Sequence, residues 1–238
     1  MAGMPDLSVQ LYSVRDAAAA DLEGSLARLA AIGLANVEPF DLGDPRRLRA
    51  ALAAYGLNAP SVHARLTEDV DGVLEAAATV GVRTVIHPYS PPEQWASPDA
   101  VDALADEIGA AARRAAGYGL QVGYHNHHWE SGDKLERFAE RAGPDVVLEL
   151  DTYWAAVGGE DVPALLGRLG DRVRLLHLKD GPISTDTSTQ VPLGQGAMPV
   201  REILAAATSA ELGVLEFDEY AGDLFEGIAE GFAYAEGL

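Results

Sequence analysis

The stretch GPDVVLELD, residues 143–151, carries the pattern that decides the fold. It joins a glycine, an apolar run and a carboxylate that directly follows the run. Glycine adopts the left-handed backbone conformation at little cost, so Gly143 is placed where a helix would end. The run from Val146 to Leu150 predicts a buried strand of the kind found in parallel sheets. The stretch therefore predicts a helix end, a strand and a polar residue at the strand's C-terminal end.

The same joint of helix, glycine and short apolar run recurs along the chain. An opening run lies at residues 7–12, and the later runs follow Gly33, Gly56, Gly81, Gly119, Gly143, Gly170 and Gly213. Helix-start signals stand between them, such as Asp44-Pro45 and Ser97-Pro98. Strict alternation predicts a parallel sheet with crossover helices. Eight such units predict an α/β fold, a single-domain (β/α)₈ TIM barrel over residues 1–238, with a doubly wound open sheet as the alternative.

Composition limits the partners of this chain. It has 17 Lys and Arg against 37 Asp and Glu, a formal net charge of −20, which argues against nucleic acids and anionic membranes as partners. A small phosphorylated substrate stays compatible with it. The absence of cysteine excludes disulfides, thiolate nucleophiles and cysteine-bound zinc. With no evident signal peptide and no apolar run long enough to span a membrane, we expect a cytoplasmic protein.

Histidines gather at one kind of position. All six follow or end a predicted strand. They are His63, His87, His125, His127, His128 and His177. The C-terminal ends of barrel strands open on one face, where active sites lie, so we expect these side chains to share a functional site.

Carboxylates follow the same rule. Asp151, Glu216 and Glu130 come at or just after strand ends, where a buried carboxylate must be paired, bound to metal or protonated. Two or three carboxylates with one imidazole predict one divalent metal, with Mn²⁺, Mg²⁺ or Co²⁺ favoured and Zn²⁺ compatible. A structural ion-pair network is the alternative. Glu149 shares a strand face with Asp151, and we expect it either to orient a metal ligand or to be a protonated core carboxyl.

Two connections after strands are long, at residues 90–96 and 181–199. Long loops at the catalytic face of a barrel are candidates for lids, and ordinary mobile loops are the alternative.

Five motifs then identify a family. In order they are Tyr124-His125-Asn126-His127-His128-Trp129-Glu130, Leu150-Asp151-Thr152-Tyr153-Trp154, His177-Leu178-Lys179-Asp180, Leu193-Gly194-Gln195-Gly196 and Leu215-Glu216-Phe217-Asp218. With Gln10-Leu11-Tyr12-Ser13 near the start, the chain resembles the sugar phosphate isomerase/epimerase family of xylose isomerase-like TIM barrels over essentially its whole length. Each motif is weak alone, and their order is what makes the resemblance specific.

The resemblance implies a metal held by residues of the last four strands. Carried over, the ligands are Glu130, Asp151, His177 and Glu216. Two departures stand out. Some members place the first glutamate within the strand, where this chain has Tyr124, so His125 or His127 could replace Glu130 as the ligand. Related sequences often have glutamate at the position of Gln195, which leaves the reaction type open.

The implied activity is a metal-dependent isomerase or epimerase of a keto- or aldo-sugar, or of a sugar-like polyol, that works through an enediolate. Glu130 and Glu216 would move the proton, with His127 as the alternative base. The small-molecule substrate would be positioned by His63, His87, His125, Trp154 and Lys179.

Other functions stay open. The same enediolate could expel a leaving group, which would make the protein a lyase or dehydratase of a keto-sugar, a keto-inositol or a 3-keto-glycoside. A nuclease is disfavoured by the negative charge and by the two lysines of the chain. A barrel that binds a sugar without turnover is the non-enzymatic alternative. Barrels of this type often dimerise, so a homo-oligomer is compatible with the sequence.

Overall fold

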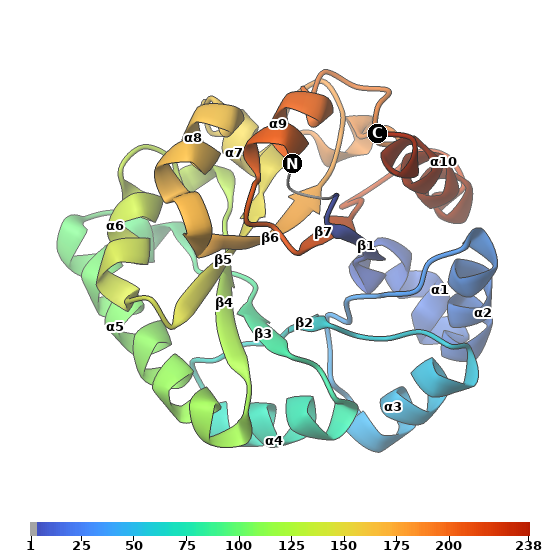
Figure 1. Cartoon of the computed structure of the whole chain (residues 1–238), viewed down its shortest axis with the longest axis horizontal. Helices are drawn as coiled ribbons and strands as arrows, with labels where there is room; N and C mark the ends of the chain where they lie inside the picture. The colour runs from blue at the N-terminus through green and yellow to red at the C-terminus, as the bar shows by residue number, and fades with distance from the viewer. Residues whose placement is uncertain (1–3) are drawn as a thin grey trace.

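Strands form an inner ring and helices surround it in the computed structural model, which describes residues 4–238 (Figure 1). Within that range the sheet has seven parallel strands in the order β1-β7-β6-β5-β4-β3-β2. They are β1 (Asp6–Val9), β2 (Ser61–His63), β3 (Thr84–His87), β4 (Gln121–His125), β5 (Val146–Asp151), β6 (Val173–Leu178) and β7 (Leu212–Leu215). Each predicted strand except that at residues 36–40 is a regular strand, with ends shifted by a few residues.

Residues 36–38 take the eighth place in the ring, between β1 and β2. They make two isolated parallel bridges, Gln10 with Glu38 and Asn36 with Asn58. The Glu38 N–H donates to the Val9 carbonyl at 2.7 Å, and the Val37 N–H donates to the Asn58 carbonyl at 2.9 Å. The short segment thus joins the two edges of the sheet and closes it, as the eight-unit prediction requires.

Helices alternate with the strands and cover the outside of the ring (Figure 1). They are α1 (Arg15–Ala20), α2 (Leu22–Ile32), α3 (Pro45–Ala54), α4 (Val70–Val80), α5 (Pro98–Ala115), α6 (Lys134–Ala142), α7 (Thr152–Val157), α8 (Val162–Leu169), α9 (Val200–Ala206) and α10 (Leu224–Glu236). Short 3₁₀ turns are η1 (Leu11–Val14), η2 (Pro92–Trp95), η3 (Ala116–Tyr118), η4 (His128–Glu130), η5 (Gly170–Arg172) and η6 (Thr187–Thr189). The two predicted long loops contain η2 and η6.

Helix ends agree with the sequence signals in most places. The Asp44 carboxylate accepts from the Arg46 and Arg47 N–H groups, and the Ser97 hydroxyl accepts from the Ala100 N–H. Both therefore cap the helices that the sequence predicts. The prediction for Gly213 is wrong, because α9 ends at Ala206 and Gly213 is the second residue of β7.

The inside of the ring is filled in layers. Side chains alternate along a strand, so every second residue points into the barrel. Five apolar residues form a small interior cluster: Ile86, Val147, Leu175, Leu212 and Val214. Two residues further along β5 and β6 the inward positions become Glu149 and His177, so the polar layers lie directly on the apolar one. The larger apolar core packs the outer strand faces against the helices.

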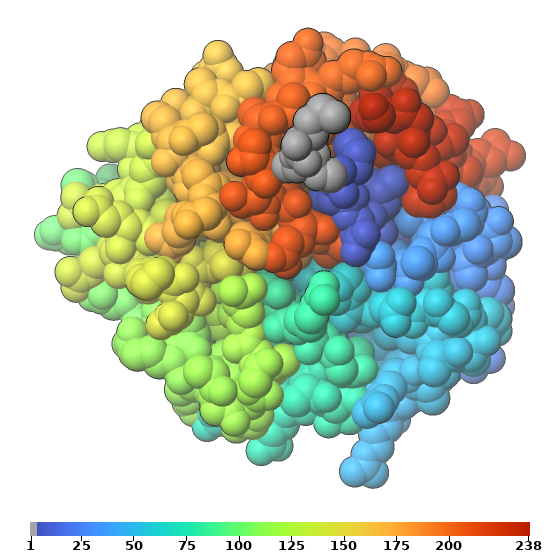
Figure 2. Space-filling model, in the orientation of Figure 1, coloured from blue at the N-terminus to red at the C-terminus, as the bar shows by residue number. Residues whose placement is uncertain are grey.

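The two ends of the chain meet in space. β1 pairs with β7 from Asp6 opposite Leu212 to Val9 opposite Leu215. In the space-filling view, the blue N-terminal segment accordingly lies against the orange segment near the C-terminal end (Figure 2). Among residues 4–238, none of the helices combines the length and the apolar character that crossing a membrane requires.

Candidate metal centre

Three of the predicted metal ligands come together at the C-terminal ends of adjacent strands. Asp151 ends β5, His177 lies opposite it in β6, and Glu216 directly follows β7. Their ligand atoms lie within 4.8 Å of one another, and all three residues are buried. The His177 Nδ1 atom is 2.7 Å from Glu216 Oε2. We call these three residues the ligand cluster.

The ligand cluster has one spare acceptor. Asp151 Oδ1 accepts from the Trp154 N–H at 2.7 Å and so caps α7. Asp151 Oδ2 is buried and makes no hydrogen bond of good geometry with residues 4–238, and its nearest cationic group is Lys179 Nζ at 3.0 Å. A buried carboxylate oxygen in such a place needs a positive charge or a proton beside it, and here the lysine supplies that charge. With two carboxylates and one imidazole beside it, this oxygen fits a divalent metal ion.

Glu130, the fourth predicted ligand, lies apart from the ligand cluster. The Tyr124 hydroxyl donates to Glu130 Oε1 at 3.1 Å, and His127 Nδ1 is 3.7 Å from the same oxygen. Burial raises the pKa of the Glu130 carboxyl well above its ordinary value. Tyr124 stands at the position where some relatives have a glutamate. It supplies no carboxylate there and instead donates a hydrogen bond to Glu130. His125, a predicted substitute, lies closer, with Nε2 3.6 Å from Asp151 Oδ2.

Lys179 contacts the ligand cluster directly. Its Nζ atom is 3.0 Å from Asp151 Oδ2 and 2.8 Å from Glu216 Oε2. It is also 3.0 Å from Asp218 Oδ2. Burial alone would lower the pKa of Lys179, but these carboxylates outweigh it and hold the pKa well above the ordinary value. The ammonium group is thus a permanent positive charge inside the site.

The carboxylates next to Lys179 respond differently to their surroundings. Burial raises the pKa of Asp151 to about 6, although Lys179 and His177 oppose this shift. Burial also acts to raise the pKa of Glu216, but Lys179 and His177 outweigh it and hold that pKa well below its ordinary value. Glu216 is therefore ionised at neutral pH, and Asp151 is easier to protonate.

A second group of buried residues holds the other side of the His177 ring. His177 Nε2 lies 2.9 Å from Glu38 Oε1 and 3.1 Å from Glu149 Oε2. The third member, His63, is 2.6 Å from Glu149 through its own Nε2 atom. We call Glu38, His63 and Glu149 the support cluster.

The support cluster is held in its ionised form. Burial would lower the pKa of His63, but Glu38 and Glu149 outweigh it and raise that pKa to about 9. Burial acts against ionised Glu149 as well, yet His177 and His63 bring its pKa to about 2. Of the two possibilities that the sequence allows, an ionised Glu149 fits the orienting one, since a carboxylate 3.1 Å from His177 Nε2 restrains that ring.

The histidines predicted to bind substrate fall in different surroundings. His87 Nδ1 accepts from the Leu66 N–H at 3.1 Å, and burial lowers the His87 pKa to about 4, so this ring supports the backbone. His127 is partly exposed and stacks on Trp129, with ring centroids 4.7 Å apart. Trp154 lies beside the ligand cluster, with Lys179 Nζ 5.5 Å from its ring centroid.

The long loop at residues 181–199 is tied down by one carboxylate. Asp180 is buried and accepts from the backbone N–H groups of Gly181, Gly194, Gly196 and Met198, at 2.8 to 3.0 Å. In the same loop the Gln190 amide donates to Asp218 Oδ2 at 2.8 Å. The loop is thereby connected to the carboxylate that contacts Lys179.

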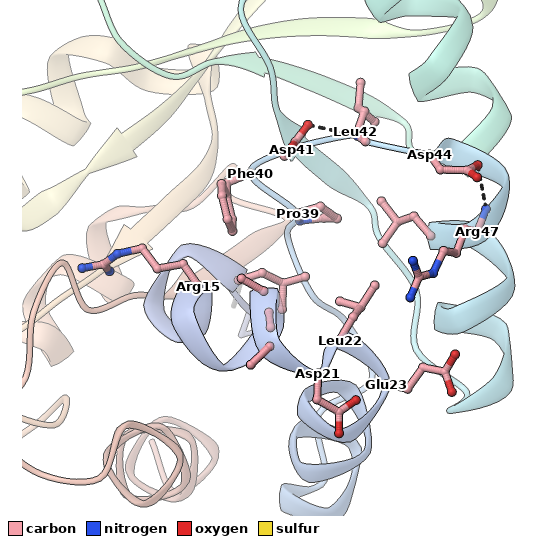
Figure 3. A pocket seen from close by; sticks show the side chains of 16 residues that line it. Arg15, Asp21, Leu22, Glu23, Pro39, Phe40, Asp41, Leu42, Asp44 and Arg47 are labelled. Atoms are coloured by element: carbon pink, nitrogen blue, oxygen red, sulfur yellow. Dashed lines mark hydrogen bonds between the residues drawn. The ribbon is translucent and has the colours of Figure 1, made fainter.

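A groove of about 470 Å³ lies outside the centre, between α1, α2 and the loop that leads to α3 (Figure 3). Pro39 and Phe40, which directly follow Glu38, form part of its wall. In this view one oxygen of the Asp44 carboxylate, Oδ1, accepts from the first turn of α3. None of the residues of either cluster lines the groove, and we do not assign the reaction to it.

The comparison with known families agrees with this geometry. Residues 26–212 match the family described as xylose isomerase-like TIM barrel. The chain belongs to this family. The resemblance drawn from the five motifs is therefore confirmed, and so is the barrel fold.

Individual relatives of this xylose isomerase-like barrel are distant. A stretch of 83 residues is 35% identical to an inosose dehydratase of Geobacillus kaustophilus (strain HTA426), and it covers 33% of this chain and 27% of that enzyme. The structure of a sugar phosphate isomerase/epimerase from Parabacteroides distasonis ATCC 8503 superimposes with a TM-score of 0.82 at 23% identity, covering 98% of this chain and 94% of that one. The IOLI protein, solved with a bound zinc atom, gives 0.77 at 15% identity, with 98% and 95% covered. At these identities the two structures show a shared fold alone.

Three residues of the site in this xylose isomerase-like barrel were not predicted from the sequence to belong to it. Glu38 was expected only as part of a strand, although it follows the rule of a carboxylate near a strand end. Asp218 stands two residues after Glu216 and had the same signal. Gln190 had none, because only the path of its loop brings it to Asp218.

Proposed function

We propose that the chain is a divalent-metal-dependent isomerase or epimerase of a keto- or aldo-sugar or of a sugar-like polyol. One observation carries the proposal. The ligand atoms of Asp151, His177 and Glu216 converge within 4.8 Å of one another, all buried, at the catalytic face of the barrel, and a lysine is the cation that faces the two carboxylates. Membership of the family supports the reaction class.

The metal would be held by Asp151, His177 Nδ1 and Glu216. When bound, it makes the hydrogen next to a substrate carbonyl more acidic by stabilising the negative charge that develops on the oxygen. The donor set favours Mn²⁺, while the zinc atom in the IOLI protein keeps Zn²⁺ in the set of metals to test. The support cluster would fix the His177 ring so that Nδ1 faces the metal.

Proton transfer needs one group that accepts and one that donates. Glu216 is ionised and is our choice for the base. Burial raises the pKa of Glu130 well above its ordinary value, which favours the protonated form, and we assign this residue the return of the proton from the other side. His127 is the alternative base, since burial and Lys179 lower its pKa to about 3 and keep the ring neutral. To serve instead as a fourth metal ligand, Glu130 would have to lose its proton and move from its contact with Tyr124 toward the ligand cluster.

The substrate would lie between the ligand cluster and an aromatic wall. The wall consists of Trp129, His127 and Trp154, whose rings stack or lie close to one another. Aromatic faces suit the apolar face of a sugar ring. Lys179 would face the substrate's oxygen atoms, and His63 and His125 would complete the floor of the site.

Hydrogen exchange tests the proposal without a known product. A panel of ketoses, aldoses and keto-inositols is incubated in D₂O with Mn²⁺-loaded protein, and deuterium at the carbon next to the carbonyl is followed by NMR. We expect exchange with wild-type protein and its loss with Glu216→Gln. Exchange that persists unchanged in Glu216→Gln would remove the base role of this residue. Absence of exchange across the panel, with metal bound, would contradict the isomerase assignment.

A lyase or dehydratase is the second candidate, and two observations favour it. The 35% identical stretch belongs to an inosose dehydratase. Gln195, where related sequences often have glutamate, donates to Glu230 at 2.6 Å on the surface, so it brings no carboxylate to the substrate. Mass spectrometry of the product separates the two candidates, because an isomer keeps its mass and elimination loses water or an aglycone.

A further inference from the structure

We infer that Lys179 competes with the metal for Asp151 and Glu216, and that Asp218 retains the ammonium group when the metal binds. This inference rests on the metal site proposed above. It concerns how the site is loaded, and it makes Lys179 a counter-ion of the ligand carboxylates in addition to a substrate contact.

The first observation is the position of the ammonium group. Lys179 Nζ lies 3.0 Å from Asp151 Oδ2 and 2.8 Å from Glu216 Oε2, two oxygens that the proposed metal would need. The lysine side chain is 1% exposed, so water does not screen its charge. A buried ammonium group is stable only against carboxylates, and here it uses the ligand carboxylates for that purpose.

Geometry makes the two cations antagonists. Carboxylate oxygens bind first-row divalent metals at about 2.0–2.2 Å. An ammonium nitrogen that keeps its contacts with the same oxygens would then lie within about 5 Å of the metal, and repulsion between the charges is strong in a buried site. Metal binding therefore requires the ammonium group to move away from Asp151 and Glu216.

Asp218 is placed to receive it. Lys179 Nζ already contacts both of its oxygens, at 3.1 and 3.0 Å, and the Asp218 side chain is 22% exposed. The Gln190 amide donates to one of these oxygens, and the Asp218 N–H donates to Gln190 Oε1 at 2.8 Å. Asp218 is thus held in place from the loop at residues 181–199 and can keep the lysine without help from the ligand cluster.

A double-mutant cycle on metal affinity tests the inference. Metal-free wild type, Lys179→Met, Asp218→Asn and the double variant are titrated calorimetrically with Mn²⁺ and with Zn²⁺. We expect Lys179→Met to bind at least tenfold more tightly and Asp218→Asn at least tenfold more weakly. In the Lys179→Met background, Asp218→Asn should change affinity by less than about threefold, because Asp218 acts through the lysine. Arg174→Met, which removes a positive charge at the opposite end of β6, is the matched control and should bind as wild type does.

The outcomes are distinguishable. Unchanged or weaker binding by Lys179→Met overturns the competition and makes the lysine a scaffold for the ligands. If Asp218→Asn lowers metal affinity equally in wild type and in Lys179→Met, the role of Asp218 is overturned. The loss would then reflect only the removed negative charge and not the retention of the lysine. Binding by Lys179→Met where wild type binds nothing supports the inference most strongly. If neither protein binds metal, the metal-dependent function and this inference fail together. Should Lys179→Met not fold, tighter or unchanged binding by Asp218→Asn overturns the inference by itself.

Discussion

The two sides of the His177 ring offer a comparison between clusters of the same chemistry. On the Nε2 side, each carboxylate of the support cluster contacts His63 and His177, and Glu38 also accepts from Gln10 and Ser61, while Glu149 Oε1 has no hydrogen bond from the described residues. On the Nδ1 side, the ligand cluster has two carboxylates close to one imidazole and one lysine. Asp151 Oδ2 has no hydrogen bond there from the described residues.

The two clusters show that one barrel can hold a structural group of charged residues and a candidate functional group on opposite sides of a single ring. A buried network in which each carboxylate contacts histidines of the same network keeps its geometry without a ligand. In the ligand cluster the carboxylates face a lysine instead, and this ammonium group is the cation that the proposed metal would displace. His177 contacts both clusters, so the support cluster sets the orientation of the ring that the ligand cluster uses.

Removing the shared ring should have the largest effect. His177→Ala leaves Glu38, Glu149 and Glu216 without a main partner, and breaking a buried ion pair costs about 3–5 kcal/mol. We expect urea unfolding of the metal-free variant to show a loss of this size, together with no saturable metal binding. A variant that keeps wild-type stability would show that the support cluster does not depend on His177.

Replacing one carboxylate on each side separates the two clusters. Asp151→Asn removes the spare acceptor, and we expect metal affinity to fall by far more than for a change outside the ligands. Glu38→Gln keeps all three ligands and loosens the His177 ring, so affinity should fall by about 10–100-fold. Calorimetric titration with Mn²⁺ measures both values. Equal losses in the two variants would contradict the division between ligand and support.

The sequence predicts the residues at strand ends better than the residues in turns and loops. Strand parity and position place Asp151, His177 and Glu216 at the catalytic face, because a parallel barrel brings all strand ends together. The same rule would have found Glu38. Glu130 shows the limit, since it lies beyond β4 in a 3₁₀ turn, where the direction of its side chain depends on packing against Tyr124.

The segment that closes the barrel and the long loop were also predicted poorly from local sequence patterns. The sequence predicts a strand at residues 36–40, but only two bridges form there, because the segment fills a gap whose width the other strands set. The contacts of Asp218 with Gln190 depend on the path of a loop without periodicity. Tertiary packing, which no local pattern reports, decides these positions.

The charge of His63 makes the support cluster sensitive to alkaline pH. Its pKa in the folded protein is about 9, above the ordinary value of 6.5, so the protonated ring stabilises the fold. That stabilisation is complete below about pH 6.5 and is lost as the pH rises through about 9. We expect the melting temperature of metal-free wild type to fall across this range, and that of His63→Gln to change less. Parallel curves for the two proteins would show that the pH dependence originates elsewhere.

The same kind of ion pair on the surface should have the smallest effect. Arg137 on α6 binds Asp102 on α5 through two nitrogens, each 2.7 Å from a carboxylate oxygen, and the arginine lowers the pKa of Asp102. Water competes for both groups, so an exposed pair contributes little even when its geometry is good. We expect Asp102→Asn to lower the melting temperature by about 2 °C or less, and the difference to shrink in 1 M salt because the ions screen the pair. A fall in melting temperature as large as that of His177→Ala would show that geometry matters more than burial for the strength of an ion pair. The buried ion pairs around His177 would then have no physical reason to differ from this surface pair.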